Sequence, residues 1–420
     1  MRSRIVPLFL SCSLFFACES VDDDVEAPAA DDAGPAAMAD AAPQLPEGCD
    51  YFVEPGDDDQ TAVQEVLIEA DAGRTVCLGA GTFQFMAEVS ISVDGLTLRG
   101  AGGDETILDF TAQDLGANGV YVSGDGVTLE DFQVLNAKGD GIRGDEVEGI
   151  VFRRLKVFWE RDADAGNGAY GVYPVGCTNV LVEECVVKGA SDAGIYVGQS
   201  RNILVRGNEA YGNVAGIEIE NSTDAEVVDN HAHDNTAGIL IFTLPELPMK
   251  EGRRSLVHRN IIENNNVPNF GRAGSVVSNV PGGTGAMILA ADETEFTGNT
   301  VQGNNTTGLM LITYIVELLG PYEDEEYDKY PERNWVHDNN WMNNGAMPMS
   351  VVGDFGVVDG PDIIADGCYD DVQMDAARRN CVAETTADYG VLQICGDLSY
   401  ALGDLAAFDC VGTDVSEIDL

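Results

Sequence analysis

The fold is decided by two consecutive segments with the same pattern, AGIYVGQSRNILVRGNEAYGN at residues 193–213 and AGIEIENSTDAEVVDNHAHDN at residues 215–235. Each begins with an apolar–Gly–apolar step, continues through short apolar–polar alternations and ends in an Asn-x4-Asn motif. Alternation with a period of two is typical of β-strands. Repetition of one such unit indicates a solenoid, in which each unit packs only on its neighbours.

The same unit recurs along most of the chain. Its glycine start is followed by an apolar residue at Gly119, Gly141, Gly171, Gly194, Gly216, Gly238, Gly285 and Gly308. Its asparagine pair recurs at Asn208/Asn213, Asn230/Asn235, Asn260/Asn265, Asn299/Asn304 and Asn339/Asn344. Asparagines at one turn of successive coils can hydrogen-bond along the stack. Because an antiparallel sandwich would not keep both registers, the sequence predicts an all-β, right-handed, single-stranded parallel β-helix of about ten coils of 22–23 residues.

The segments outside the repeat suggest the domain organisation. Arg2 and Arg4 precede an apolar run at residues 5–17, which has the length of a signal peptide and is too short to span a bilayer. The run ends in LFFAC, which resembles a bacterial lipobox, so we expect lipidation at Cys18, with ordinary secretion as the alternative. We expect a signal peptide (1–17), an acidic Ala/Pro-rich tether (18–48), an N-terminal cap with a helix over 59–72 (49–88), the β-helix (89–350) and a Cys-rich cap (351–420).

Eight cysteines remain beyond the signal peptide and Cys18, an even number that predicts disulfides in an exported chain. Cys49 and Cys77 are placed to staple the N-terminal cap. The C-terminal cluster consists of Cys368, Cys381, Cys395 and Cys410, and its pairing is left open. Cys177 and Cys185 are either paired or buried thiols.

The composition limits the partners. Asp and Glu number 72 against 22 Lys and Arg, giving a net charge of −50. Such a chain is a poor ligand for nucleic acid, and we expect it to reach a membrane only through its lipid. It would also repel an anionic polymer unless Ca²⁺ bridges the two or salt screens them. We expect a monomer in the cell envelope, at the outer membrane, the cell surface or the periplasm.

A family resemblance follows from particular stretches. The N-terminal helix followed by Gly81-Thr82-Phe83 resembles the entry cap of pectate-lyase-like β-helices. The segments 168–175, 191–200, 215–222 and 283–285 resemble exported bacterial parallel β-helix repeat-containing lipoproteins, over roughly residues 75–345. This resemblance implies the fold and export, and it implies no particular reaction.

One outward face is the candidate site. The residue after each starting glycine is expected to point inward, so the next one points outward. The first outward column is Tyr121, Arg143, Tyr173, Tyr196, Glu218, Leu240, Met287 and Met310. The second is Ser123, Asp145, Val175, Gly198, Glu220, Phe242, Leu289 and Ile312. With coils ~4.8 Å apart, Tyr121 to Glu218 spans about 19 Å, which suits several sugar rings.

We therefore predict that this face binds a polysaccharide or other glycan. The predicted ligand-binding residues are Tyr121, Asp145, Trp159, Tyr170, Tyr173, Asp192, Tyr196 and Gln199. Insertions at 159–170, 245–256, 264–284 and 314–334 would wall the groove. The alternatives are cross-strand stacking and ion pairing on a solvated sheet, with loops that only cover the apolar residues.

Two further functions compete with glycan binding. Glu218 and Glu220 share one face of a strand and are candidates for acid–base catalysis with Arg143, as in a polysaccharide lyase, epimerase or hydrolase. The same carboxylates with Asp192 or Asp145 are a candidate Ca²⁺ site, against the alternative of a solvated acidic patch. The third hypothesis is a scaffold that binds an envelope protein through the apolar part of the face. The glycan, the presence of catalysis and the membrane are not readable from the sequence.

The remaining motif is His231-Ala232-His233, which places two imidazoles on the outward side of another strand. A His-x-His pair on a strand can bind Zn²⁺ or Cu²⁺. Because the sequence shows no third ligand, exposed polar sheet residues are the default interpretation, and a metal is left open.

Overall fold

The computed structural model describes residues 45–368, 370–395 and 399–420. The predicted signal peptide, the lipidation site Cys18 and most of the predicted tether lie outside the described residues. No helix in the described part of the chain is long and apolar enough to cross a bilayer.

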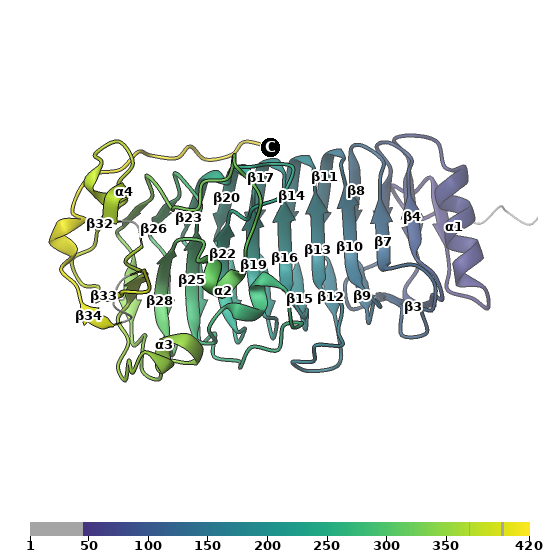
Figure 1. Cartoon of the computed structure of the whole chain (residues 1–420). Coiled ribbons are helices and arrows are strands. Elements are labelled where there is room, and N and C mark those ends of the chain that lie inside the picture. Colours follow the sequence, from purple (N-terminus) through teal and green to yellow (C-terminus); the bar gives the residue numbers. More distant parts are fainter. Residues whose placement is uncertain (1–44, 369, 396–398) are drawn as a thin grey trace, which may run out of the picture. The chain divides into compact units, whose positions relative to one another are not determined.

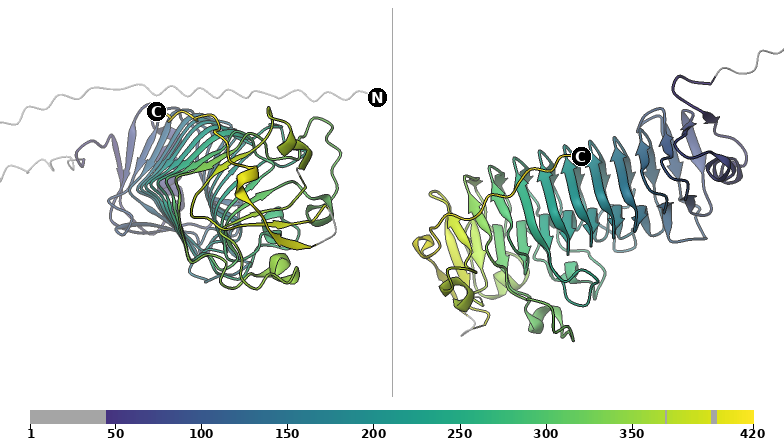
Figure 2. Two further views of the ribbon diagram at one scale, coloured as in Figure 1. Left: turned by 90° about the vertical axis from the view of Figure 1, so that its left-hand side faces the viewer. Right: turned by 90° about the horizontal axis from the view of Figure 1, so that it is seen from above.

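The described strands form three long sheets, which we call A, B and C (Figures 1 and 2). Sheet A contains β1 (Tyr51–Val53), β2 (Thr75–Leu78), β5 (Thr97–Arg99), β8 (Val127–Glu130), β11 (Glu148–Arg153), β14 (Thr178–Glu183), β17 (Arg201–Arg206), β20 (Thr223–Val228), β23 (Arg253–His258), β26 (Glu295–Thr297), β29 (Trp335–His337) and β32 (Cys381–Ala383). Sheet B contains β3 (Gly81–Gln84), β6 (Thr106–Asp109), β9 (Gln133–Leu135), β12 (Lys156–Phe158), β15 (Val186–Lys188), β18 (Glu209–Tyr211), β21 (His231–His233), β24 (Ile261–Glu263), β27 (Thr300–Gln302) and β30 (Asn340–Met342). Sheet C contains β4 (Val89–Ile91), β7 (Asn118–Val122), β10 (Asp140–Asp145), β13 (Tyr170–Val175), β16 (Ala193–Gly198), β19 (Ala215–Glu220), β22 (Ala237–Phe242), β25 (Thr284–Leu289), β28 (Thr307–Ile312), β31 (Ile363–Ala365), β33 (Tyr389–Leu392) and β34 (Tyr400–Leu402).

Each coil passes through sheets C, A and B in turn, and each strand pairs in parallel with the equivalent strand of the next coil. The partners are 22 residues apart in the uninterrupted coils, as in Ile195–Ile217 and Ile217–Ile239. The described exception is the antiparallel pair β33–β34. The predicted parallel β-helix is confirmed.

Inward side chains fill the space between the sheets. The residue after each starting glycine is at most 2% exposed, as predicted: Val120, Ile142, Val172, Ile195, Ile217, Ile239, Ala286 and Leu309. They join one continuous hydrophobic core that runs the length of the stack. This continuity is what a solenoid needs, because a single coil cannot bury its apolar face alone.

Two asparagine ladders run along the turns. Asn230 is 1% exposed, and its Nδ2 donates to Val205 O (2.9 Å) and to Asn260 Oδ1 (3.0 Å). Its Oδ1 accepts from the backbone N–H of Asn208 at 2.9 Å. The second ladder repeats this geometry at Asn235. These bonds satisfy buried backbone groups in every coil that carries the motif.

Helix α1 (Asp59–Glu69) covers the N-terminal end of the stack (Figure 1). Asp58 caps it by accepting from the N–H of Thr61, and the helix is three residues shorter than the predicted 59–72. The shorter helices are α2 (Val316–Leu319), α3 (Ser350–Asp354) and α4 (Asp370–Met374), with 3₁₀ turns η1 (Val276–Asn279) and η2 (Leu405–Ala407).

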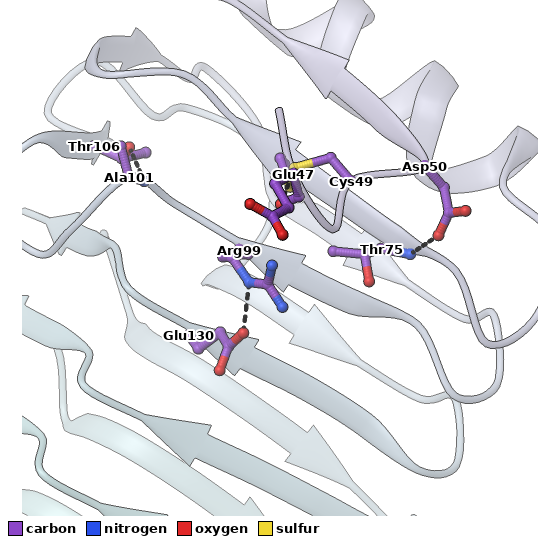
Figure 3. Close-up of a disulfide and its surroundings, with 9 residues drawn as sticks. Glu47, Cys49, Asp50, Thr75, Arg99, Ala101, Thr106 and Glu130 are labelled. Atoms are coloured by element: carbon purple, nitrogen blue, oxygen red, sulfur yellow. Dashed lines mark hydrogen bonds and ion pairs between the residues drawn. A yellow bond between two sulfur atoms is a disulfide. The ribbon is translucent and has the colours of Figure 1, made fainter. Parts of the chain in front are cut away.

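Disulfides close both ends. Cys49 is bonded to Cys77 near the first coils (Figure 3), and the C-terminal pairs are Cys368–Cys395 and Cys381–Cys410. Cys177 and Cys185 are free and buried, so of the two alternatives left open for them the structure selects buried thiols.

Parallel pairing extends beyond the predicted domain limits. Strands β1–β3 of the expected N-terminal cap already join sheets A and B, and β31–β33 continue the stack after residue 350. The last ten residues then run back along sheet A (Figure 1), where Ile418 packs on Leu181, Leu204 and Val228.

Candidate functional site on sheet C

The two outward columns predicted from the repeat lie side by side on sheet C. Arg143 is paired with Tyr121 and Tyr173, and Glu218 with Tyr196 and Leu240. In the second column Asp145 aligns with Val175, and Glu220 with Phe242. The register was therefore predictable, but the exposure of these side chains was not.

The first part of the face is a row of aromatic and charged side chains that are partly exposed. The ring of Tyr170 lies 4.5 Å from both Tyr173 and Tyr196, measured between centroids. The Arg143 guanidinium lies over the Tyr173 ring at 5.0 Å and donates to Asp145 Oδ1 at 2.8 Å. We call Arg143, Asp145, Tyr170 and Tyr173 the sheet C strip.

Tyr121 and Gln199 each contact a carboxylate on this face. The Tyr121 hydroxyl donates to Asp145 Oδ2 at 2.8 Å. Gln199 Nε2 lies 3.3 Å from Glu220 Oε1. Both side chains therefore contact the predicted site, and both already have partners on it.

Glu218 and Glu220 are not a solvated acidic patch, since they are only 3% and 8% exposed. The Tyr196 hydroxyl donates to Glu220 Oε1 at 2.5 Å, and the two glutamates lie on the same face of one strand. Burial raises the pKa of both carboxyl groups, and for Glu218 the charges of Asp192 and Glu220 add to this. Two carboxyls this close share protons more readily than they ionise together.

Two further carboxyls of sheet C and its loops have raised pKa values. Burial raises the pKa of Asp140 to about 6. Burial, followed by the charge of Glu220, also raises the pKa of Asp192. Each of these four carboxyls therefore keeps its proton to a higher pH than an ordinary carboxyl group, which is a property expected of general acids and bases.

Buried polar atoms without a hydrogen-bond partner are spread over the described residues, and some of them lie on or beside this face. Among the described side chains, buried atoms without a hydrogen-bond partner include Arg143 Nε, Asn167 Oδ1 and Glu218 Oε2. Glu218 Oε2 is the one carboxylate oxygen of that kind in the described residues. Unpaired buried polar groups are costly, and a bound ligand would supply the missing partners.

Two insertions meet above this part of the face. Arg272 donates to Asn167 O at 2.8 Å and to Ala165 O at 3.1 Å, which ties the loop at 264–283 to the loop at 159–169. Trp159, predicted to bind ligand, lies in the core at 2% exposure, with its indole N–H donating to Ala137 O. That prediction was wrong, because Trp159 extends the backbone ladder after β12 and its side chain turns inward.

The second part of the face is apolar and covered. Leu240, Phe242, Met287 and Met310 are at most 5% exposed, so they form no exposed patch for a partner protein. Loops and α2 leave above them a mostly apolar cavity of about 290 Å³, lined also by Leu289 and Ile312. The Tyr327 hydroxyl donates to Thr243 O at 2.7 Å and so holds the 314–334 insertion against the sheet.

Metal-ligating groups cluster elsewhere. In the described residues, three ligand atoms approach within 4.8 Å of one another at Glu209/His231/His233 and at Glu226/His258/Glu417. Neither group includes Glu218 or Glu220, so the predicted Ca²⁺ ligands do not converge in this way. Glu209 was missed in the sequence, although it precedes His231 by one 22-residue repeat and is its register partner.

The comparisons with known proteins agree with this architecture. A family model described as "Right handed beta helix region" matches residues 94–246. No curated protein matches the chain in sequence. The A-module of mannuronan C-5 epimerase AlgE4 from Azotobacter vinelandii superposes with a TM-score of 0.53 at 16% identity, over 76% of this chain and 81% of that one. The AlgE6 A-module from the same organism gives 0.51 at 15% identity, over 79% and 84%.

The chain is a right-handed parallel β-helix, the fold that it shares with the two epimerase A-modules. The predicted resemblance is thereby confirmed for the fold. At 15–16% identity these likenesses carry no residue roles, so the chemistry of the site has to be argued from its own side chains.

Proposed function

We propose that the sheet C strip binds a polysaccharide. The observation that carries the proposal is the combination, on one partly exposed face, of packed tyrosine rings with polar atoms that have no partner. Sugar rings offer apolar faces that pack on aromatic rings, and hydroxyls that can pair with Arg143 Nε and with carboxylates. The similar A-modules are epimerases of a polysaccharide by name, which supports a glycan as the ligand class.

The charge of the strip favours a neutral or amino-substituted glycan. The strip contains Asp145 and lies beside Asp140 and Asp192, whereas Arg143 and Arg272 are the cations whose charges act on these two carboxyls. A net charge of −50 adds a long-range repulsion against polyanions. An acidic polymer would need Ca²⁺ or high salt to overcome this repulsion. Calcium is therefore varied in the experiment below.

The second candidate is processing of the bound glycan by proton transfer. It is favoured by the raised pKa values of Glu218, Glu220, Asp140 and Asp192, which allow one group to donate a proton while another accepts it. Lyase, epimerase and hydrolase chemistry are distinguished by the products that turnover releases.

The experiment uses the chain from Gln44 onward with neutral, acidic and amino polysaccharides, each with Ca²⁺ or chelator. Binding is measured by titration calorimetry. Turnover is followed through reducing ends, unsaturated uronate and, for epimerisation, NMR. Tyr173→Ala should weaken binding by about tenfold, which corresponds to ~1.4 kcal/mol. Tyr330→Ala is the matched control, since Lys329 lies over that ring at 5.1 Å much as Arg143 lies over Tyr173.

Glu218→Gln separates binding from catalysis. The amide is neutral like the protonated acid, so it should leave binding intact and abolish any turnover. Equal binding by wild type and Tyr173→Ala, or no binding to any glycan tested, would refute the proposal.

We also propose that the chain is exported and lipid-anchored at Cys18. The N-terminal sequence and the three disulfides support this, because disulfides persist in oxidising compartments. Fractionation of cells expressing the wild type and Cys18→Ser tests it. The variant should move from the membrane to the soluble fraction, and a wild type found in the cytosol would contradict both parts.

A further inference from the structure

The geometry points to a divalent metal site on sheet B, formed by His231 and His233 with Glu209 and Glu263, that takes zinc or an ion of similar chemistry. His233 Nε2 lies 3.1 Å from Glu209 Oε1, and His231 Nε2 lies 2.9 Å from Glu263 Oε1. One ligand atom each from Glu209, His231 and His233 lies within 4.8 Å of the other two.

These separations are close to what zinc requires. With bonds of 2.0–2.1 Å, a tetrahedral zinc ion spaces its ligand atoms about 3.4 Å apart. The two His–Glu contacts are already at that scale. The Glu209 side chain is 45% exposed, so its carboxylate has room to turn toward a bound ion.

The β-helix register places the four side chains on one face in three successive coils, with Glu263 contacting His231 from outside the converging group of three. Glu209 on β18 is the register partner of His231, and His233 on β21 is the partner of Glu263 on β24. Residues at equivalent positions of parallel coils leave the same face of the sheet, ~4.8 Å apart. A bound ion would therefore join three successive coils across the outer face of sheet B.

Outer partners orient both kinds of ligand. Asp234 Oδ2 lies 2.8 Å from His233 Nδ1, which directs the opposite ring nitrogen, Nε2, toward Glu209. Gln302 Nε2 donates to Glu263 Oε2 at 2.5 Å and leaves Oε1 facing His231. Carboxylates and amides that fix the ligands in this way are typical of metal sites.

The donor set selects the class of ion. Two imidazole nitrogens with carboxylate oxygens suit Zn²⁺, Cu²⁺ or Ni²⁺, whereas Ca²⁺ and Mg²⁺ prefer oxygen alone. The His231 and His233 side chains are 37% and 18% exposed, so an ion can reach them from solvent. The site is separate from the sheet C strip and does not depend on the proposed function.

A second histidine of the chain provides an internal comparison. His337 has the same surroundings as His233, with Nε2 3.1 Å from Glu295 Oε1 and Nδ1 2.8 Å from Asp338 Oδ2. An aromatic ring stacks on each, Trp335 on His337 and Tyr211 on His233. What His337 lacks is a second imidazole, whereas the His231 and His233 rings lie 4.1 Å apart between centroids. His231 therefore distinguishes a chelating site from an ordinary His–Glu pair.

The experiment titrates the purified full chain with ZnCl₂ after chelator treatment. It is done in millimolar CaCl₂, so that exposed carboxylates are occupied. Calorimetry gives stoichiometry and affinity, and CoCl₂ reports coordination through its visible absorption. The variants are His231→Gln, His233→Gln, Glu209→Gln and Asp234→Asn, with His337→Gln as the matched control. Circular dichroism checks that each one folds.

We expect one zinc ion per chain in the presence of calcium. His231→Gln and His233→Gln should each weaken binding by more than tenfold, and Asp234→Asn by about tenfold or more. His337→Gln should bind like the wild type. Wild-type affinity in His231→Gln, an equal loss in His337→Gln, or no zinc bound in calcium would each overturn the inference. If one histidine variant fails to fold, the zinc affinity of Glu209→Gln tests the same inference, since that side chain is 45% exposed.

Discussion

Replacing Asn230 by alanine tests whether the asparagine ladder holds the coils together. The side chain makes four hydrogen bonds at 2.9–3.0 Å, two through Oδ1 with Asn208 and two through Nδ2 with Val205 O and Asn260 Oδ1. It is 1% exposed, so water cannot replace those partners. The substitution therefore removes bonds from groups that stay buried.

The cost follows from which groups keep a partner. Asn208 Nδ2 still donates to Val182 O, and Asn260 Oδ1 still accepts from the backbone N–H of residue 230. The backbone N–H of Asn208 loses its partner, at ~1–3 kcal/mol, and the other three lost bonds contribute ~0.5–1.5 kcal/mol each. The expected loss is about 2.5 to 7.5 kcal/mol, a large share of the ~5–15 kcal/mol that stabilises a typical domain.

Urea unfolding followed by circular dichroism measures this loss. Hydrogen exchange at the Asn208 amide locates it, since a solenoid can open locally. The control is Asn340→Ala, one residue beyond the ladder residue Asn339. Its exposed amide contacts Met342 Sδ at 3.9 Å, and a change within ~0.5 kcal/mol is expected. If Asn230→Ala loses less than ~1 kcal/mol, or no more than the control, the ladder is not a major source of stability.

Three other properties can be measured directly. Since burial raises the pKa of Asp140 from 3.8 to about 6, its contribution to stability is present below pH ~4 and is lost as pH rises through 6. Asp140→Asn should thus match the wild type near pH 4 and be more stable at pH 8 by up to ~3 kcal/mol in melting experiments, and an unchanged pH profile would contradict this. Burial raises the pKa of Cys177 to about 11 and that of Cys185 to about 12, so a thiol reagent should label neither until denaturant is added; labelling of the native chain would show that they are accessible. Ile418→Asp should detach the C-terminal segment from sheet A and speed its proteolysis while the coils melt as before, whereas unchanged proteolysis would mean that the apolar contact does not hold it.

The fold could be predicted from the sequence because the repeat determines the strand pairing, the inward side chains and the turns together. The spacing of 22 residues sets the pairing of Ile195 with Ile217 and of Ile217 with Ile239, and alternation then fixes which side chains enter the core. The Asn-x4-Asn motif marks the turns independently of the apolar pattern. Agreement between such separate signals is what specifies a single structure.

The site was less predictable because insertions have no period. Glu218 and Glu220 were placed on the correct face, but their burial depends on neighbouring side chains and on loops whose course the repeat does not fix. Trp159 was predicted to be accessible to ligand and lies in the core instead. It follows strand β12, and the inward–outward alternation was not continued to it. Glu209 could have been found by subtracting one repeat from His231, because the register rule applies to sheet B as it does to sheet C.

The contrast between the ladders and the sheet C strip is itself evidence for function. Along the turns, the asparagine ladders supply a partner for nearly every buried polar group they reach, coil after coil. On sheet C the same chain buries Glu218 although its Oε2 has no hydrogen-bond partner. Arg143 Nε, in the sheet C strip, is also unpaired. A neutral residue at position 218 would remove the cost of desolvating a carboxyl group, so stability does not explain this choice. Buried polar groups without a hydrogen-bond partner are often those that a ligand or a reaction needs, and Glu218→Gln should therefore gain stability as it loses any turnover.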